Sequence, residues 1–148
     1  MPTIKHAMLS MMLLCIMPSV VAAQNNEHQA VAVVNLALNA YEMNGEEVFA
    51  EISTPNGEFH SGELYVFVLD VPTNTLVAHG GFPNSVGSMV TQTDKLGRNI
   101  GTYVASMATP QGVWVQYEYM NPATMQVEPK LSWTVRVDNY VFGSGIYE

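Results

Sequence analysis

The chain has 148 residues, of which 12% are charged and 48% hydrophobic, and its formal net charge is −8 at pH 7. This length suits one domain with one sizeable core. Five Lys and Arg residues stand against thirteen Asp and Glu residues. This balance argues against a nucleic-acid partner and against docking on anionic lipid, because both need clustered basic side chains.

The N-terminal segment has the parts of a secretory signal peptide. A short cationic start is followed by an apolar stretch over residues 7–21 and by small residues up to Ala23. We expect cleavage after Ala23, which makes residues 1–23 a signal peptide and residues 24–148 one mature domain. The alternative is an uncleaved membrane anchor. The short apolar run, interrupted by Pro18, disfavours it.

Cysteine usage points to an exported domain without disulfides. Cys15 is the only cysteine, and it would leave with the signal peptide. A lipidated cysteine is a weaker alternative, because Leu13 and Leu14 precede it where small residues are expected. The mature chain then holds itself together by its core alone. No second long apolar run follows, so we expect a periplasmic protein with no membrane span in its mature chain.

Two helices are expected at the start of the mature domain. Asn26 and Gln29 resemble an N-cap with its reciprocal partner, and Gly45 is a suitable stop. Between them, apolar residues recur at helical spacing: Ala30, Val33, Val34, Ala37, Leu38 and Tyr41. A second, short helix is expected around residues 46–52, before a turn at residues 55–57.

The remaining elements alternate between strand and helix patterns. Residues 64–69 and 75–79 form the first pair of strands, and residues 94–108 are expected to be helical with Leu96 on the apolar side. Three further strands are expected at residues 112–120, 130–137 and 140–147. Short connections imply antiparallel neighbours. The sequence therefore predicts an α+β domain: a five-stranded antiparallel sheet with helices against one face.

Four segments in this order resemble the single Cache domains, which are PAS-like extracytoplasmic sensor modules of bacterial chemoreceptors and kinases. They are residues 62–70 (GELYVFVLD), 76–79 (LVAH), 114–130 (which contain WVQYEYMNP and VEPK) and 141–147 (VFGSGIY). The resemblance covers nearly the whole of residues 24–148. It implies a PAS-like sheet carrying a long N-terminal helix, and a role in signal transduction such as chemotaxis.

The sequence departs from the family pattern at several positions. Family members usually carry an aromatic residue and a proline where this chain has Tyr119 and Met120, often a proline where Gly80 stands, and often a tyrosine where Trp133 stands. These positions lie near the ligand in such domains, so the departures bear on ligand identity. The chain ends just after the last strand, which implies a free-standing member that reports through a partner receptor or histidine kinase.

We find no signature of an enzyme. Residues 143–145 read Gly-Ser-Gly within an expected strand, which is not a nucleophile elbow. The histidines of the mature chain show no metal-ligand spacing, and no pair of carboxylates stands out for acid–base work. We therefore expect no catalysis, no metal and no cofactor.

The aromatic strand offers the first candidate binding residues. Alternation places Tyr117 and Tyr119 on one face of the sheet with Val115, and Trp114 on the other. The two tyrosines are either core residues or the wall of a pocket for a small polar ligand. Trp114 covers the opposite face or the pocket rim, and Trp133 is expected in the pocket wall.

Lys130 and His79 are the candidate polar anchors. Lysine at a strand start is commonly solvated, but the mature chain offers only four cations to balance a carboxylate: Lys95, Arg98, Lys130 and Arg136. Lys130 lies beside the aromatic strand and matches the family motif. Histidine at a strand end is commonly structural, but His79 precedes two glycines and is able to donate to a ligand oxygen.

Two functional hypotheses follow. The first is a periplasmic sensory domain that captures a small carboxylate between the sheet and the helix of residues 94–108, with closure of the segment around residues 80–101. Lys95 and Arg98 would flank such a lid. The second is a ligand-free adaptor of the same fold, whose pocket would be filled by Phe67, Met107 and Met120.

Overall fold

The structure is a computed structural model that describes the backbone of residues 18–148 and the side chains from residue 26 onward. Residues 1–17, which hold most of the predicted signal peptide, lie outside the described residues. Cleavage after Ala23 therefore stays a prediction. Within residues 18–148, no helix is both long enough and apolar enough to cross a membrane.

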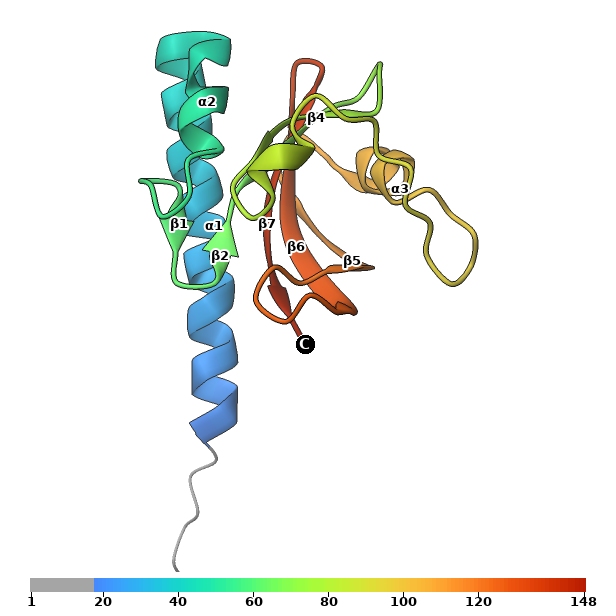
Figure 1. The fold of residues 1–148 in the computed structure, drawn as a ribbon. Coiled ribbons are helices and arrows are strands. Elements are labelled where there is room, and N and C mark those ends of the chain that lie inside the picture. The colour runs from blue at the N-terminus through green and yellow to red at the C-terminus, as the bar shows by residue number, and fades with distance from the viewer. Residues whose placement is uncertain (1–17) are drawn as a thin grey trace, which may run out of the picture.

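The chain forms helices first and then a sheet interrupted by one further helix (Figure 1). The helical elements are α1 (Pro18–Asn44), η1 (Gly45–Glu47), α2 (Val48–Ile52), η2 (Pro83–Ser85) and α3 (Ile100–Met107). The strands are β1 (His60–Ser61), β2 (Leu64–Tyr65), β3 (Phe67–Asp70), β4 (Thr75–His79), β5 (Val113–Met120), β6 (Val127–Val137) and β7 (Tyr140–Tyr147).

Five strands form one antiparallel sheet in the order β4-β3-β7-β6-β5, and β1 and β2 form a separate small hairpin. The five-stranded sheet confirms the predicted α+β class. The link between β6 and β7 is the predicted turn at residues 138–139, where Asp138 takes a φ of 52°. Asp tolerates this left-handed conformation better than most residues, so the tight connection carries little strain.

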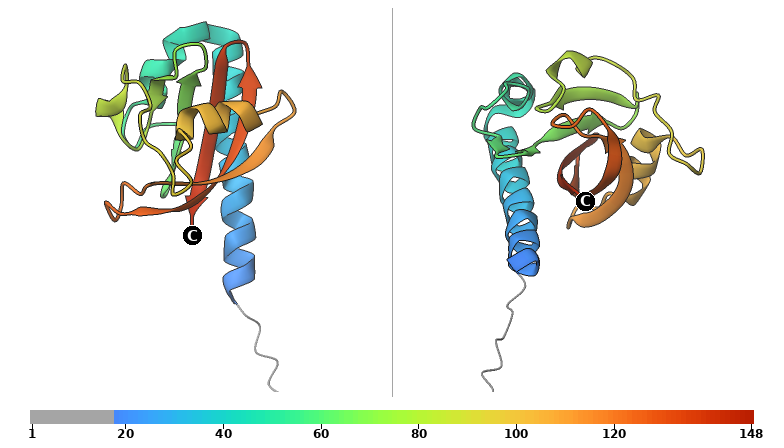
Figure 2. Two further views of the ribbon diagram at one scale, coloured as in Figure 1. Left: turned by 90° about the vertical axis from the view of Figure 1, so that its right-hand side faces the viewer. Right: turned by 60° about the horizontal axis from the view of Figure 1, so that its bottom comes forward.

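Helices cover both faces of the sheet, which corrects the expectation that they lie on one face. In Figure 1, α1 and α2 lie on one side of the sheet and α3 on the other, and Figure 2 shows α3 crossing in front of the strands. Alternation along the strands supplies both cores: Val68 and Phe142 pack toward α1 and α2, whereas Leu69 and Val141 pack toward α3. The chain therefore has two apolar layers separated by the sheet.

Two helix boundaries differ from the sequence prediction. Helix α1 begins at Pro18, before the expected cap at Asn26, and its N-terminal part extends beyond the sheet (Figure 1). The mid-chain helix begins at Ile100, because Asn99 is its N-cap and accepts from the backbone N–H of Thr102. Gly97 has a φ of 75°, which interrupts any earlier helix, and Leu96 is exposed.

Candidate functional site

A small cavity lies between α3 and the sheet. Apolar side chains form most of its wall, and three aromatic rings, one histidine and one lysine complete it. Its lining residues are Phe67, Leu69, Leu76, His79, Val90, Ile100, Gly101, Val104, Tyr117, Tyr119 and Lys130. The cavity measures about 30 Å³, which is room for one or two water molecules. The predicted location between the sheet and the mid-chain helix is where this cavity lies.

Lys130 is the unusual member of this wall, because its side chain is 1% exposed and no carboxylate among the described residues pairs with it. The two ion pairs found among the described residues, Lys95–Glu118 and Arg98–Asp94, lie elsewhere. A buried ammonium without a counterion loses hydration that no opposite charge replaces. Burial therefore lowers the pKa of Lys130 from 10.5 to about 7.

Aromatic rings surround the Lys130 ammonium. Its Nζ lies within 6 Å of four ring centroids, a range in which the negative face of a ring attracts a cation: Tyr65 at 4.4 Å, Tyr147 at 5.0 Å, Phe67 at 5.3 Å and Tyr119 at 5.4 Å. These contacts compensate part of the lost hydration. They supply no negative charge to pair with the ammonium.

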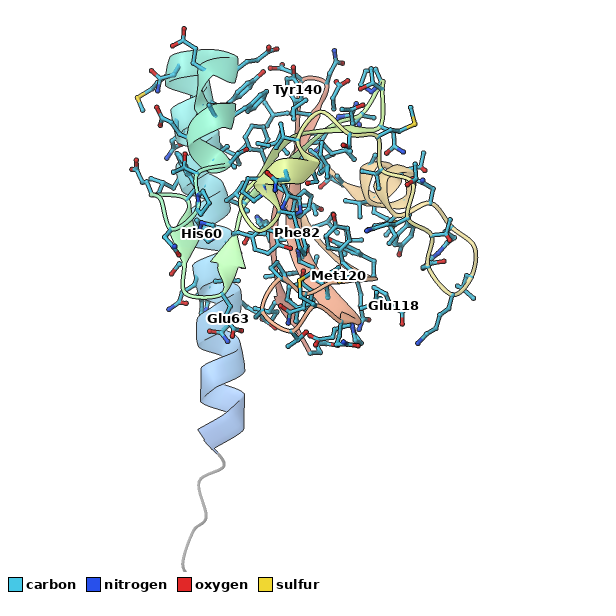
Figure 3. The ribbon with its side chains drawn as sticks, viewed as in Figure 1. His60, Glu63, Phe82, Glu118, Met120 and Tyr140 are labelled. Atoms are coloured by element: carbon cyan, nitrogen blue, oxygen red, sulfur yellow. The ribbon has the colours of Figure 1, made fainter. Side chains whose placement is uncertain are left out.

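A directed chain of hydrogen bonds begins at Lys130. Its Nζ donates to the Tyr65 hydroxyl at 2.9 Å, and the Tyr65 and Tyr147 hydroxyls are 2.7 Å apart. Tyr147 donates to the carbonyl oxygen of Met120 at 2.8 Å, so Tyr65 must be the donor to Tyr147. These hydrogen bonds fix the lysine head group, and they end at Met120, the last residue of β5, which Figure 3 labels.

His79 lies in the same cavity and is neutral. Its Nδ1 accepts a hydrogen bond of 2.8 Å from the backbone N–H of Phe82, so the neutral ring carries its proton on Nε2. Burial, and secondly the charge of Lys130, lower the pKa of His79 from 6.5 to about 3. At neutral pH the imidazole therefore offers one N–H donor and adds no charge of its own.

The structure brings together four of the six predicted binding residues. Lys130, His79, Tyr117 and Tyr119 all line the cavity. Their role in binding stays a prediction.

The two tryptophans are elsewhere. Trp114 and Trp133 are direct cross-strand neighbours, with ring centroids 5.5 Å apart, and Trp133 packs against the core beneath α1. They do not line this cavity. Lys130 and Trp133 are three residues apart on one strand, so their side chains point to opposite faces.

The alternation of Tyr65 and Phe67 with Val66 and Val68 indicates mainly core residues, and Tyr147 is not among the predicted binding residues. In the structure Tyr65 and Tyr147 hold the Lys130 head group, and Phe67 lines the cavity. Glycine makes room for Phe67, because a Cβ at Gly143 on the neighbouring strand would overlap its ring. The alternating Tyr65-Val66-Phe67 pattern was the available signal, but it does not separate a pocket wall from a core.

The segment between β4 and α3 closes the cavity on one side. Its middle part adds to the edge of β4, since the backbone N–H of Leu76 donates to Ser88 and that of Val90 to Asn74. Val90 then contributes to the cavity wall. Lys95 and Arg98 lie in the loop before α3, which corrects their predicted place in the helix.

One ion pair fastens this loop to the sheet. The Lys95 Nζ lies 2.7 Å from a carboxylate oxygen of Glu118 on β5. In Figure 3, Glu118 lies at the α3 side of the molecule.

No group of three or more His, Cys, Asp or Glu side chains in the described part of the chain is arranged to hold a metal ion. The chemistry that this cavity offers is that of a buried cation, one neutral imidazole donor, phenol hydroxyls and an apolar end. Phenols, an amine and an imidazole are suited to holding a small anion.

The comparison with protein families decides the class of the domain. The model of the family Single Cache domain 2 matches residues 25–148. The chain belongs to the single Cache domain family. The resemblance seen in the sequence is thereby confirmed, over nearly the whole described length. No curated protein matches the chain.

Solved structures of similar fold come from chemotaxis proteins. A methyl-accepting chemotaxis protein from Vibrio parahaemolyticus aligns with a TM-score of 0.62 at 15% identity, over 87% of this chain and 91% of that one. The periplasmic sensor domain of a chemotaxis protein aligns with a TM-score of 0.64 at 19% identity, over 85% and 96%.

A third structure is described as the basis for carboxylic acid recognition by a Cache chemosensory domain. It aligns with a TM-score of 0.60 at 18% identity, over 89% of this chain and 99% of that one. At these identities the alignments establish the fold. Together with the family match, they support a ligand-binding sensory domain.

Proposed function

We propose that this single Cache domain is a periplasmic sensory domain that captures a short organic acid and reports it to a partner receptor or histidine kinase. The observation that carries the proposal is Lys130, a buried lysine that faces a cavity and has no anionic partner among the described residues. A carboxylate placed in the cavity would supply the missing charge and form charge-assisted hydrogen bonds.

The remaining wall supports a small ligand with a single carboxylate. Lys130 and His79 supply donors at one end, while Leu69, Ile100 and Val104 make the other end apolar. A second carboxylate would be buried against these aliphatic side chains without a partner, which is costly. A cavity of about 30 Å³ must widen to admit even a two-carbon acid, and the segment of residues 81–99 with α3 is the part of the wall outside the sheet.

The small cavity also favours the second hypothesis, a ligand-free adaptor of the same fold. The filling residues expected for that hypothesis are only partly in place: Phe67 lines the cavity, whereas Met107 is exposed. Burial of a lysine without a counterion costs stability, and the adaptor hypothesis gives no function that would offset this cost. This is why we favour ligand capture.

A thermal-shift titration tests the proposal. A ligand that binds only the folded protein must raise its melting temperature. We expect acetate and propionate at millimolar concentration to raise it, and we expect acetamide, which has a similar shape and no charge, to have little effect. An unchanged melting temperature with every short carboxylate and amine tested would support the ligand-free adaptor instead.

A further inference from the structure

The environment of Lys130 constrains the charge that can enter the cavity. The cavity wall from β3, β4, β5 and α3 contains no carboxylate. The titratable groups that face Lys130 are Tyr65 from β2, His79 from β4, Tyr117 and Tyr119 from β5 and Tyr147 from β7. All five are neutral near pH 7, because burial raises the pKa of each tyrosine and lowers that of the histidine.

The two acidic side chains close to Lys130 in the register of β5 and β6 are already engaged. Glu128, on the same strand as Lys130, accepts hydrogen bonds from Asn121 and Thr124. Glu118 pairs with Lys95 in the loop before α3. Neither lines the cavity. Without a bound anion, the folded protein is therefore most stable when Lys130 is a neutral amine and the site carries no net charge.

We infer that the cavity takes up a carboxylate together with a proton, so that the pair enters as the electrically neutral acid and the proton comes to rest on Lys130. This inference rests on the proposed function. The balance is simple: the amine of Lys130, one proton from solvent and one carboxylate anion give an ammonium–carboxylate pair. No bond to carbon forms or breaks.

The geometry supports Lys130 as the resting place of the proton. Its Nζ has one hydrogen-bond partner, the Tyr65 hydroxyl, which leaves N–H directions for a carboxylate oxygen. The surrounding ring faces favour the charged form once an anion is present. His79 is less suited, because its Nδ1 is occupied by the Phe82 N–H and its protonation would place a second cation beside Lys130.

A functional consequence follows for the signal. Above neutral pH, occupancy depends on the product of the carboxylate and proton concentrations, which is proportional to the concentration of the undissociated acid. Below neutral pH, Lys130 is already charged, and occupancy follows the carboxylate alone. The domain would thus report undissociated weak acid in neutral to alkaline surroundings.

Calorimetry of the purified protein with acetate as the probe tests the inference. Each titration is performed at about pH 8.5 and at about pH 6 in two buffers of different ionisation enthalpy, which yields the number of protons taken up. We expect close to one proton per acetate at the higher pH and close to none at the lower. The affinity for acetate should fall about tenfold per pH unit above neutrality.

The outcomes separate this inference from the proposed function. Absence of acetate binding at both pH values, together with a melting temperature that no short carboxylate or amine changes, overturns the proposed function. Binding at about pH 8.5 without proton uptake overturns only the inference. The variant His79→Asn keeps an acceptor for Phe82 and cannot titrate, so the number of protons taken up per acetate bound should stay close to one even where the affinity falls. Its loss with binding retained would move the proton to His79 and overturn the assignment to Lys130.

Discussion

Lys130 and His79 approach one cavity from different strands, and the charge of the lysine helps to keep the histidine neutral. In the proposed anion site, Lys130 would supply the charge and His79 a neutral N–H donor. Both residues carry a cost for the folded protein, since each would be better solvated in the unfolded chain. Variants that remove either group should therefore change the free energy of unfolding.

Replacing the buried lysine by an apolar side chain of similar length should stabilise the fold and abolish carboxylate binding. We expect Lys130→Met to raise the free energy of unfolding at about pH 6 by about 1–4 kcal/mol, because a buried charge without a partner is removed. Urea unfolding measures this gain. The exposed Lys95→Met is the matched control, for which we expect no gain in stability, because its ammonium is solvated and its ion pair lies at the surface.

The pH dependence of that gain has a definite sign. The pKa of Lys130 is lower in the folded than in the unfolded chain, so the unfolded state binds more protons between pH 7 and pH 10.5. The wild type should therefore gain stability as the pH rises through this window, and the advantage of Lys130→Met should shrink. An advantage that stays constant from pH 6 to pH 10 would mean that Lys130 keeps its ordinary pKa.

His79 should make the protein sensitive to acid. Its pKa is about 3 in the folded chain against 6.5 when unfolded, so stability is complete above pH 6.5 and is lost as the pH falls toward 3. The loss amounts to at most about 5 kcal/mol for one such group. The free energy of unfolding of His79→Asn should therefore depend less on pH over this range than that of the wild type. The variant His28→Asn, at an exposed position, should show the same pH dependence as the wild type.

The apolar end of the cavity should set the length of the acid. Ile100 lines the cavity, so Ile100→Val adds room for about one methyl group at a cost of about 0.5–1.5 kcal/mol in stability. We expect the affinity for propionate to rise relative to that for acetate. Ile52→Val, in the core beneath α1, is the matched control. An equal change of the propionate-to-acetate ratio in both variants would speak against a direct contact.

The Lys95–Glu118 ion pair should slow ligand exchange. It joins the loop before α3 to β5, and Lys95 is largely exposed, so its loss should change the free energy of unfolding only slightly. We expect Glu118→Gln to speed both association and dissociation of acetate in stopped-flow measurements, with little change in affinity. High salt should produce the same effect in the wild type. Unchanged rates in the variant would show that the loop does not limit access.

Much of the fold could be predicted because strands and turns leave local marks. The last strand, Tyr140–Tyr147, begins and ends where its pattern predicts, because Asp138 and Asn139 form a turn and the aromatic and β-branched residues that follow favour a strand. The start of α3 was placed too early. The apolar spacing of Leu96 with Ile100 suggested a helix, but the cap at Asn99 is the decisive local signal.

The site was predictable only in part. Lys130 stood out because cations are scarce, and alternation along β5 correctly separated Tyr117 from Trp114. The contact of Lys130 with Tyr65 joins residues 65 positions apart, so it depends on how the β2 segment lies against the sheet. No local pattern contains that information. The placement of helices on both faces was missed for the same reason.

A crystal structure of the protein saturated with acetate tests the central claim most directly. We expect a carboxylate oxygen within about 3 Å of the Lys130 Nζ, which is hydrogen-bond distance, in a cavity enlarged by movement of α3 or of the segment before it. An acetate bound elsewhere, or a saturated protein in which Lys130 still contacts only Tyr65 and its surrounding rings, would contradict the account.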